Sequence, residues 1–181
     1  PYNGSVTGLV DQLEKIKAES SNRTESATPL EQMETEAQQN PSNIPNLLTL
    51  GSAYMQMQQT SRATELFDEA LTNANISYTE AADVAQAFAQ MGNLAKVETA
   101  LEKLAIINPD APEPRYDLAR LNATLGQNAA ALQDLKTALD FAGRLNTNPA
   151  TRNALIDAAR KDPSFNSLRS LPEFQKLVPT N

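Results

Sequence analysis

The chain has 181 residues, no His, no Cys and no Trp, and a formal net charge of −7 at pH 7. Without imidazole or thiolate groups it lacks the usual zinc ligands, iron–sulfur ligation and Ser-His-Asp or Cys-His nucleophiles, so we expect no metal and no cofactor. The acidic balance repels phosphate, which excludes nucleic acid and favours a protein or peptide partner. No apolar run approaches the roughly 20 residues that span a bilayer, so we expect no direct membrane insertion of this segment.

Residues 1–43 are predicted to form a degenerate helix pair at the start of the chain. Its apolar residues recur 34 residues later, in the pairs Leu13 and Leu47, Ile16 and Leu50, and Met33 and Phe67. The polar stretch 19–28 is longer than a normal turn between helices, and we expect it to be mobile. Thr28 and Pro29 are typical of a helix cap and a first helical position.

Three units of 34 residues follow, and we place them at 44–77, 78–111 and 112–145. A small residue occupies one position in all three, as Gly51, Ala85 and Ala119. Close packing requires a small residue where the first helix of a unit crosses the second. Four further positions carry mostly apolar side chains: Tyr54, Phe88, Asn122; Ala63, Val97, Ala131; Phe67, Leu101, Leu135; and Ala70, Leu104, Ala138. Turn residues divide each unit into two helices of about 12 residues, as helical hairpins require.

These columns resemble the tetratricopeptide repeat, in which an aromatic residue is followed by L-G-x-x-Y, then A-x-x-x-F-x-x-A and a closing Pro. The first unit carries the pattern most fully, with Leu47, Leu50, Gly51, Tyr54, Ala63, Phe67 and Ala70. The second unit keeps Phe88 and Pro109, whereas the third has Arg115 and Asn122 at the two aromatic positions. The resemblance covers residues 44 to 143 and implies an all-α fold, a right-handed superhelical array of antiparallel helix pairs.

Residues 146–181 are predicted to form C-terminal capping helices, which completes a single domain over 1–181. One helix is expected from Pro149 to Lys161. The segment 162–177 then resembles a D-P-x-F-x-x-L-R-x-x-P-x-F-x-x-L tail that follows tetratricopeptide repeats in many bacterial proteins. Its apolar residues are expected to cover the end of the last repeat, which otherwise exposes apolar surface: Phe165, Leu168, Phe174 and Leu177.

The same resemblance implies a binding site, because in this family the first helices of successive units line a concave groove. The candidate groove residues are Ser52, Met55, Gln56, Gln86, Gln90, Tyr116 and Arg120. Their amides can pair with a peptide backbone, Tyr116 can serve as an aromatic anchor and Arg120 can meet a carboxylate. This set predicts a peptide site with a modest acidic preference. The alternative is a solvated helix face without a ligand.

We therefore predict a non-catalytic scaffold for protein–protein interaction. Adjacent carboxylates such as Asp68 and Glu69 are typical of solvated helix surfaces and do not indicate an enzyme.

The alternative is a structural or self-assembling soluble segment of a larger bacterial protein, with or without a membrane anchor, which a start at Pro1 without Met would suit. Residues 1–43 carry a net charge of −4 and residues 146–181 a net charge of +2, which favours weak head-to-tail self-association. The chain contains 28 Asn and Gln residues but 7 Lys residues. This polar, uncharged composition favours a periplasmic location, with the cytoplasm as the alternative.

Overall fold

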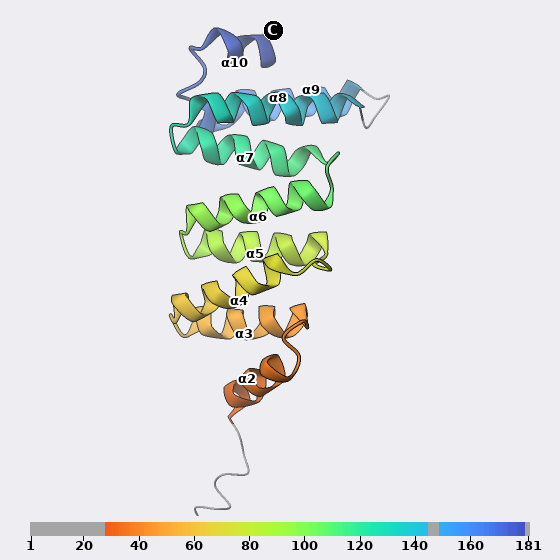
Figure 1. Ribbon diagram of the computed structural model, residues 1–181. Coiled ribbons are helices and arrows are strands. Elements are labelled where there is room, and N and C mark those ends of the chain that lie inside the picture. The colour runs from red at the N-terminus through yellow and green to blue at the C-terminus, as the bar shows by residue number, and fades with distance from the viewer. Residues whose placement is uncertain (1–27, 145–148, 180–181) are drawn as a thin grey trace, which may run out of the picture.

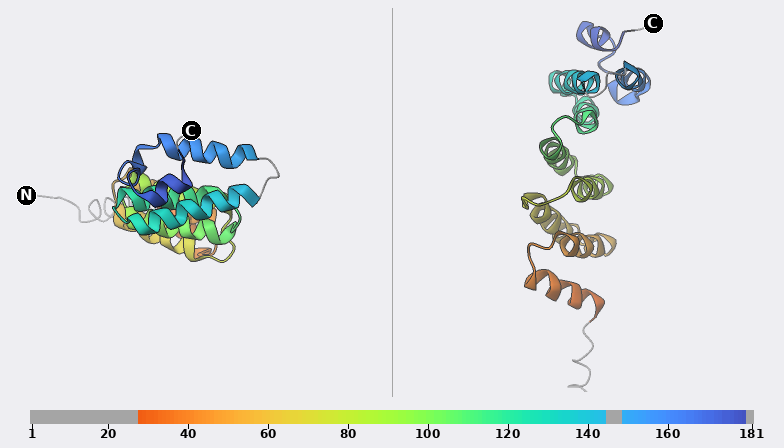
Figure 2. Two further views of the ribbon diagram at one scale, coloured as in Figure 1. Left: turned by 90° about the horizontal axis from the view of Figure 1, so that it is seen from above. Right: turned by 90° about the vertical axis from the view of Figure 1, so that its right-hand side faces the viewer.

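The chain folds into a stack of helices in a computed structural model that describes residues 28–144 and 149–179. Every regular element in these ranges is helical: α2 (Pro29–Gln39), α3 (Ile44–Gln56), α4 (Thr60–Thr72), α5 (Tyr78–Gln90), α6 (Leu94–Ile107), α7 (Pro112–Thr124), α8 (Asn128–Arg144), α9 (Pro149–Lys161), the 3-10 helix η1 (Pro163–Phe165) and α10 (Pro172–Leu177). Helices α2 to α8 succeed one another along one axis (Figure 1). Seen from the side, successive helices alternate between two columns (Figure 2). The predicted all-α superhelical array of antiparallel helix pairs is confirmed.

Helix α2 is the first described element, and its start agrees with the sequence prediction. The Thr28 hydroxyl accepts a hydrogen bond from the Glu31 amide at 3.3 Å, and the Glu31 carboxylate accepts one from the Thr28 amide at 2.7 Å. Pro29 occupies the first turn, where its missing N–H costs no hydrogen bond. The helix expected before α2 and the polar stretch at 19–27 lie outside the described residues.

The turn after each first helix repeats with the period of the sequence. Gln58, Gly92 and Gly126 have φ values of 59°, 69° and 74° and follow α3, α5 and α7. In each turn the next amide bonds back to a carbonyl five residues earlier, as Gln59 does to Tyr54 at 2.9 Å. This is the Schellman arrangement, which ends a helix through one left-handed residue. Gly adopts that conformation without strain, whereas Gln58 does not.

The crossing of α3 and α4 explains the small residue of the first unit. A Cβ atom on Gly51 would lie 2.7 Å from Cε1 of Phe67, closer than carbon atoms pack. Phe67 is buried, and its ring meets that of Phe88 edge to face with centroids 5.7 Å apart. The close approach at Gly51 therefore positions a ring that also joins the first unit to the second.

Ion pairs between second helices repeat as well. Lys96 on α6 contacts Asp68 on α4 at 2.6 Å, and Arg62 on α4 lies 3.8 Å from Glu34 on α2. Both pairs span 28 residues, so the second is the first moved by one 34-residue unit. Neighbouring second helices are thus connected by the same kind of contact in two successive units.

The third unit replaces aromatic packing by a polar network. Asn122 occupies the position of Tyr54 and Phe88 and is 3 % exposed. Its amide nitrogen donates to Asp134 at 2.9 Å, and Arg115 pairs with the other oxygen of Asp134 at 3.2 Å. This network satisfies the amide nitrogen of Asn122, whereas its Oδ1 atom is buried without a hydrogen-bond partner among the described residues.

The C-terminal tail packs into the core of the last unit. Phe165, Leu168 and Phe174 are buried, and Leu177 is half-buried at the edge of the same cluster. The cluster also contains apolar residues of α7, α8 and α9: Ala119, Ala123, Ala131, Leu135, Leu139, Ile156 and Ala159. Val178, which the sequence pattern did not indicate, belongs to the same cluster and is 4 % exposed. None of the helices in the described ranges is long and apolar enough to span a bilayer.

Candidate peptide-binding groove

A groove of about 480 Å³ opens between α5 and α7, the first helices of two successive units. We call it the α5–α7 groove. Apolar side chains of α6 and α7 form its floor: Val97, Leu101, Leu104 and Leu121. Small residues of α5 and polar residues of α5, α7 and η1 complete its lining: Ala82, Ala85, Ala89, Gln86, Asp117, Arg120, Thr124 and Ser164. Tyr78 and Leu94 also line it. An apolar floor with a polar rim is typical of a site that accepts a side chain and orients the chain that carries it.

The predicted site residues are divided between this groove and other places. Gln86 and Arg120 line the groove. Ser52 and Gln56 line a second hollow of about 490 Å³ that also contains Met33 of α2 and Asp83 of α5. The remaining predicted residues line neither hollow: Met55, which packs against the core, Gln90, which is exposed, and Tyr116.

Arg120 is held by two carboxylates of the chain itself. Its Nε lies 2.8 Å from Oδ2 of Asp162 in the tail, and its Nη1 lies 3.2 Å from Oδ1 of Asp117, one turn earlier on α7. Hydrogen bonds between guanidinium and carboxylate are the strong kind, so this arrangement fixes the side chain. The guanidinium that was expected to meet a partner's carboxylate is thus bound within the chain.

Tyr116 is also engaged by the tail. Its ring meets that of Phe165 edge to face, with centroids 5.7 Å apart and planes at 77°. Burial, together with the charge of Asp162, raises the pKa of the Tyr116 hydroxyl to about 12. The ring predicted as an anchor for a partner is therefore an anchor for the chain's own C-terminal segment.

The carboxylates around the groove differ in their electrostatic surroundings. Burial raises the pKa of Asp117, and the hydrogen bond from Arg120 offsets only part of that effect. Burial acts in the same direction on Asp162, but hydrogen bonds from Ser164 and the charge of Arg120 outweigh it and lower the pKa. Asp117 is therefore the carboxylate whose negative charge the fold stabilises less.

The Tyr78 hydroxyl lies in the negative electrostatic field of nearby carboxylates. Burial raises the pKa of its hydroxyl, and the charges of Glu113 and Asp117 raise it further. Within residues 28–144 and 149–179, no cluster of three or more His, Cys, Asp or Glu side chains could hold a metal ion. The groove thus combines apolar surface, the side-chain amide of Gln86 and an excess of negative charge.

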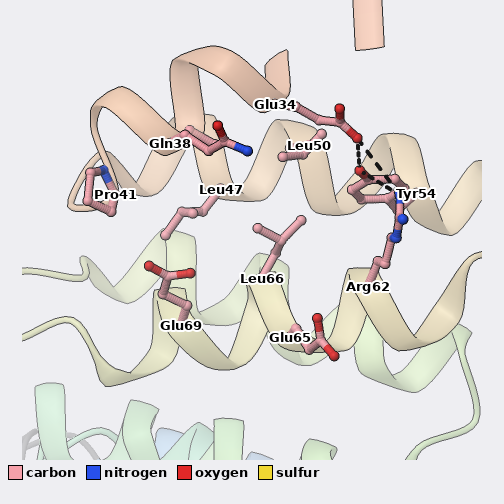
Figure 3. A pocket seen from close by; sticks show the side chains of 11 residues that line it. Glu34, Gln38, Pro41, Leu47, Leu50, Tyr54, Arg62, Glu65, Leu66 and Glu69 are labelled. Carbon is pink, nitrogen blue, oxygen red and sulfur yellow. Dashed lines mark hydrogen bonds and ion pairs between the residues drawn. The ribbon is translucent and has the colours of Figure 1, made fainter. Parts of the chain in front are cut away.

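A larger pocket of about 620 Å³ lies between α2, α3 and α4 and was not expected from the sequence. We call it the α2–α4 pocket. At one end, Glu34, Tyr54 and Arg62 point toward one another (Figure 3). The Tyr54 hydroxyl donates to Glu34, and Arg62 donates to that hydroxyl at 3.2 Å. Glu65 and Glu69 also line the pocket and form no ion pair with any described residue. Most of its polar lining therefore already participates in contacts between units or faces solvent.

Comparison with known proteins leaves the family of the chain open. No family model and no curated protein match it. Among solved structures, it is similar to two crystal structures of MamA, both at 16 % sequence identity. The first match covers 82 % of this chain and 82 % of the MamA chain, with a TM-score of 0.49. The second match covers 82 % of this chain and 80 % of the MamA chain, with a TM-score of 0.46. It is also similar to PcrH in a complex with the chaperone binding region of PopB, at 17 % identity and a TM-score of 0.45, covering 65 % of this chain and 91 % of that one. Likeness at this level carries no functional assignment.

Proposed function

We propose that the chain is a non-catalytic scaffold that binds a segment of another protein in the α5–α7 groove. The observation that carries the proposal is a groove with an apolar floor between two successive first helices, in which Leu101, Leu104 and Leu121 are buried and Val97 is half-buried. Each apolar side chain that a partner buries there contributes up to about 1.5 to 3 kcal/mol. A repeat array supports such sites well, because stacked units form an extended surface without closing into a globule.

The polar rim can orient a bound peptide segment, which an apolar floor alone cannot do. Gln86 is exposed and forms no hydrogen bond with the described residues, so its donor and acceptor are available to a peptide backbone. The small side chains of Ala82, Ala85 and Ala89 leave room for that backbone to approach α5. An extended or helical segment of another protein fits these features.

The proposal is tested by affinity capture with a variant that fills the groove. Ala89→Trp introduces a large neutral side chain at an exposed groove position. Ala154→Trp places the same side chain on the exposed surface of α9, outside the groove, and is the matched control. Proteins retained by the parent and by Ala154→Trp, identified by mass spectrometry, should be lost from Ala89→Trp. Equal retention by both variants would place binding elsewhere.

Self-association is a second candidate, favoured by pockets of opposite charge toward the two ends of the stack. The α2–α4 pocket contains Glu65 and Glu69, which form no ion pair with the described residues. A pocket of about 410 Å³ near the C-terminus contains Arg169, which likewise forms no ion pair there, and Arg160, which is paired with Asp157 at 2.6 Å. Head-to-tail contacts through these ends would give a mass that rises with concentration and falls with salt, measurable by sedimentation. A constant monomer mass at low salt would remove this candidate.

A further inference from the structure

The charge of the groove identifies the chemical class of its partner. We infer that the segment bound in the α5–α7 groove is basic and apolar, with a Lys or Arg beside an aliphatic side chain. This inference rests on the proposed function and adds the chemistry of the partner. It reverses the acidic preference expected from the sequence, which depended on a free Arg120.

Arg120 is the one cationic side chain among the described residues that line the groove. Its guanidinium is shared by Asp117 and Asp162 at 3.2 and 2.8 Å. Two carboxylates around one guanidinium leave a net negative charge. An acidic peptide would have to displace one of these internal partners and would meet repulsion from the other.

Two carboxylates near the groove form no ion pair with the described residues. Glu113 lies one turn before Asp117 on α7, is exposed and forms no ion pair with the described residues. The carboxylates of Glu113 and Asp117 act on Tyr78, which faces them from α5. Asp83 of α5 is exposed in the adjoining hollow and is likewise without an ion pair in the described ranges. The two first helices thus carry an excess of negative charge along the face where a partner would lie.

A cation beside Asp117 would add an ion pair that Arg120 supplies only in part. Asp117 is partly buried, and Arg120 neutralises it only in part, since that guanidinium also serves Asp162. A partner's ammonium or guanidinium group near Asp117 and Glu113 would complete the neutralisation of this negative charge. Lys and Arg also have long apolar stems, which suit the aliphatic floor of Val97 and Leu101.

The experiment compares two fluorescein-labelled twelve-residue peptides that alternate alanine, leucine and one charged residue, which is lysine in one peptide and glutamate in the other. Binding is measured by fluorescence anisotropy at low and physiological salt. The groove variant Glu113→Gln with Asp117→Asn removes two carboxylates beside the groove. The matched control, Glu65→Gln with Glu69→Gln, removes two from the α2–α4 pocket and changes the net charge equally. Circular dichroism and thermal melting establish that both variants fold.

We expect the lysine peptide to bind the parent and the matched control alike, and to bind the groove variant about tenfold more weakly, the loss of a charge-assisted contact of ~1.4 kcal/mol. An equal loss in both variants would mean attraction by net charge alone and would overturn the inference. A loss confined to the matched control would move the basic segment to the α2–α4 pocket and would also overturn it.

The glutamate peptide separates the failure of this inference from failure of the proposed function. If it binds more tightly than the lysine peptide and Ala89→Trp abolishes its binding, the groove is a protein-binding site and its basic preference is wrong. If neither peptide binds at millimolar concentration, the basic preference is also wrong, and capture with Ala89→Trp and Ala154→Trp still decides the function.

Discussion

Replacing Gly51 by Ala tests whether the first unit is built around the crossing of α3 and α4. The added Cβ would lie 2.7, 3.0 and 3.1 Å from three carbon atoms of the Phe67 ring. Carbon atoms in contact normally lie about 3.5 to 4.0 Å apart, so the ring or a helix must move by roughly 1 Å. Phe67 is 1 % exposed and packs edge-on against the fully buried Phe88, so the ring has no free space to enter.

Two opposing effects set the magnitude. Ala in place of Gly inside a helix gains up to about 1 kcal/mol of helix propensity, whereas overpacking a filled core typically costs about 1 to 3 kcal/mol. Because the displaced ring is held on all sides, we expect overpacking to dominate and Gly51→Ala to lose about 1 to 2 kcal/mol. Gly51→Leu should lose more. The control is Gly143→Ala in α8, which should be neutral or stabilising. Among the described residues, its Cβ would meet Cδ of Arg152 at 3.4 Å and nothing closer.

The assay is urea unfolding followed by helical circular dichroism, with each variant compared at its transition midpoint. A double variant with Phe67→Leu should recover part of the cost of Gly51→Ala, because the shorter side chain relieves the contact. If Gly51→Ala stabilises the protein as much as Gly143→Ala does, or if Phe67→Leu gives no relief, the crossing is misplaced and the packing argument is refuted.

Three further predictions concern the tail, its ion pair and a turn. Deleting residues 164–181 should lower the melting temperature and increase aggregation, because the apolar cluster around the buried Phe165 would be exposed; unchanged stability would make the tail a linker. The pKa of Asp162 is lowered in the fold, so its carboxylate stabilises the protein above its unfolded pKa of about 3.9, and this stabilisation is lost as the pH falls through the folded pKa. Asp162→Asn should therefore be less stable than the parent at pH 7 and approach it near pH 2 in chemical unfolding, whereas equal stability at pH 7 would contradict the pairing with Arg120. Gln58→Gly should raise the unfolding free energy by about 1 kcal/mol, because Gln58 has a φ of 59°; a loss of stability would show that its side chain matters more than its backbone.

The repeating contacts could be predicted from the sequence because each depends on a fixed spacing. A small residue at Gly51 and a ring at Phe67 are set by the helix crossing, and breakers at Gly92 and Gly126 are set by the left-handed turn. The same register could have revealed the ion pairs of Lys96 with Asp68 and Arg62 with Glu34, since both combine opposite charges 28 residues apart.

The contacts of Arg120 and Tyr116 with the C-terminal tail could not be predicted from the repeat spacing. Arg120 and Tyr116 lie on a first helix, as expected, but Asp162 and Phe165 come from a tail that does not follow the 34-residue period. Their meeting depends on how η1 packs against α7, which is a tertiary contact without a local signal. The expected acidic preference assumed a free Arg120, and the fold pairs this side chain with Asp117 and Asp162.

The most direct measurement of the central claim is site-specific photo-crosslinking in the cells that express the protein. A photoreactive amino acid replaces Gln86 on the rim of the α5–α7 groove, and in a second variant it replaces Ala154 on the exposed surface of α9. The groove account predicts a discrete crosslinked protein from the Gln86 position, absent from the Ala154 position and lost when Ala89→Trp is added. The same crosslink from both positions, or a crosslink at Gln86 that persists with Ala89→Trp, would contradict it.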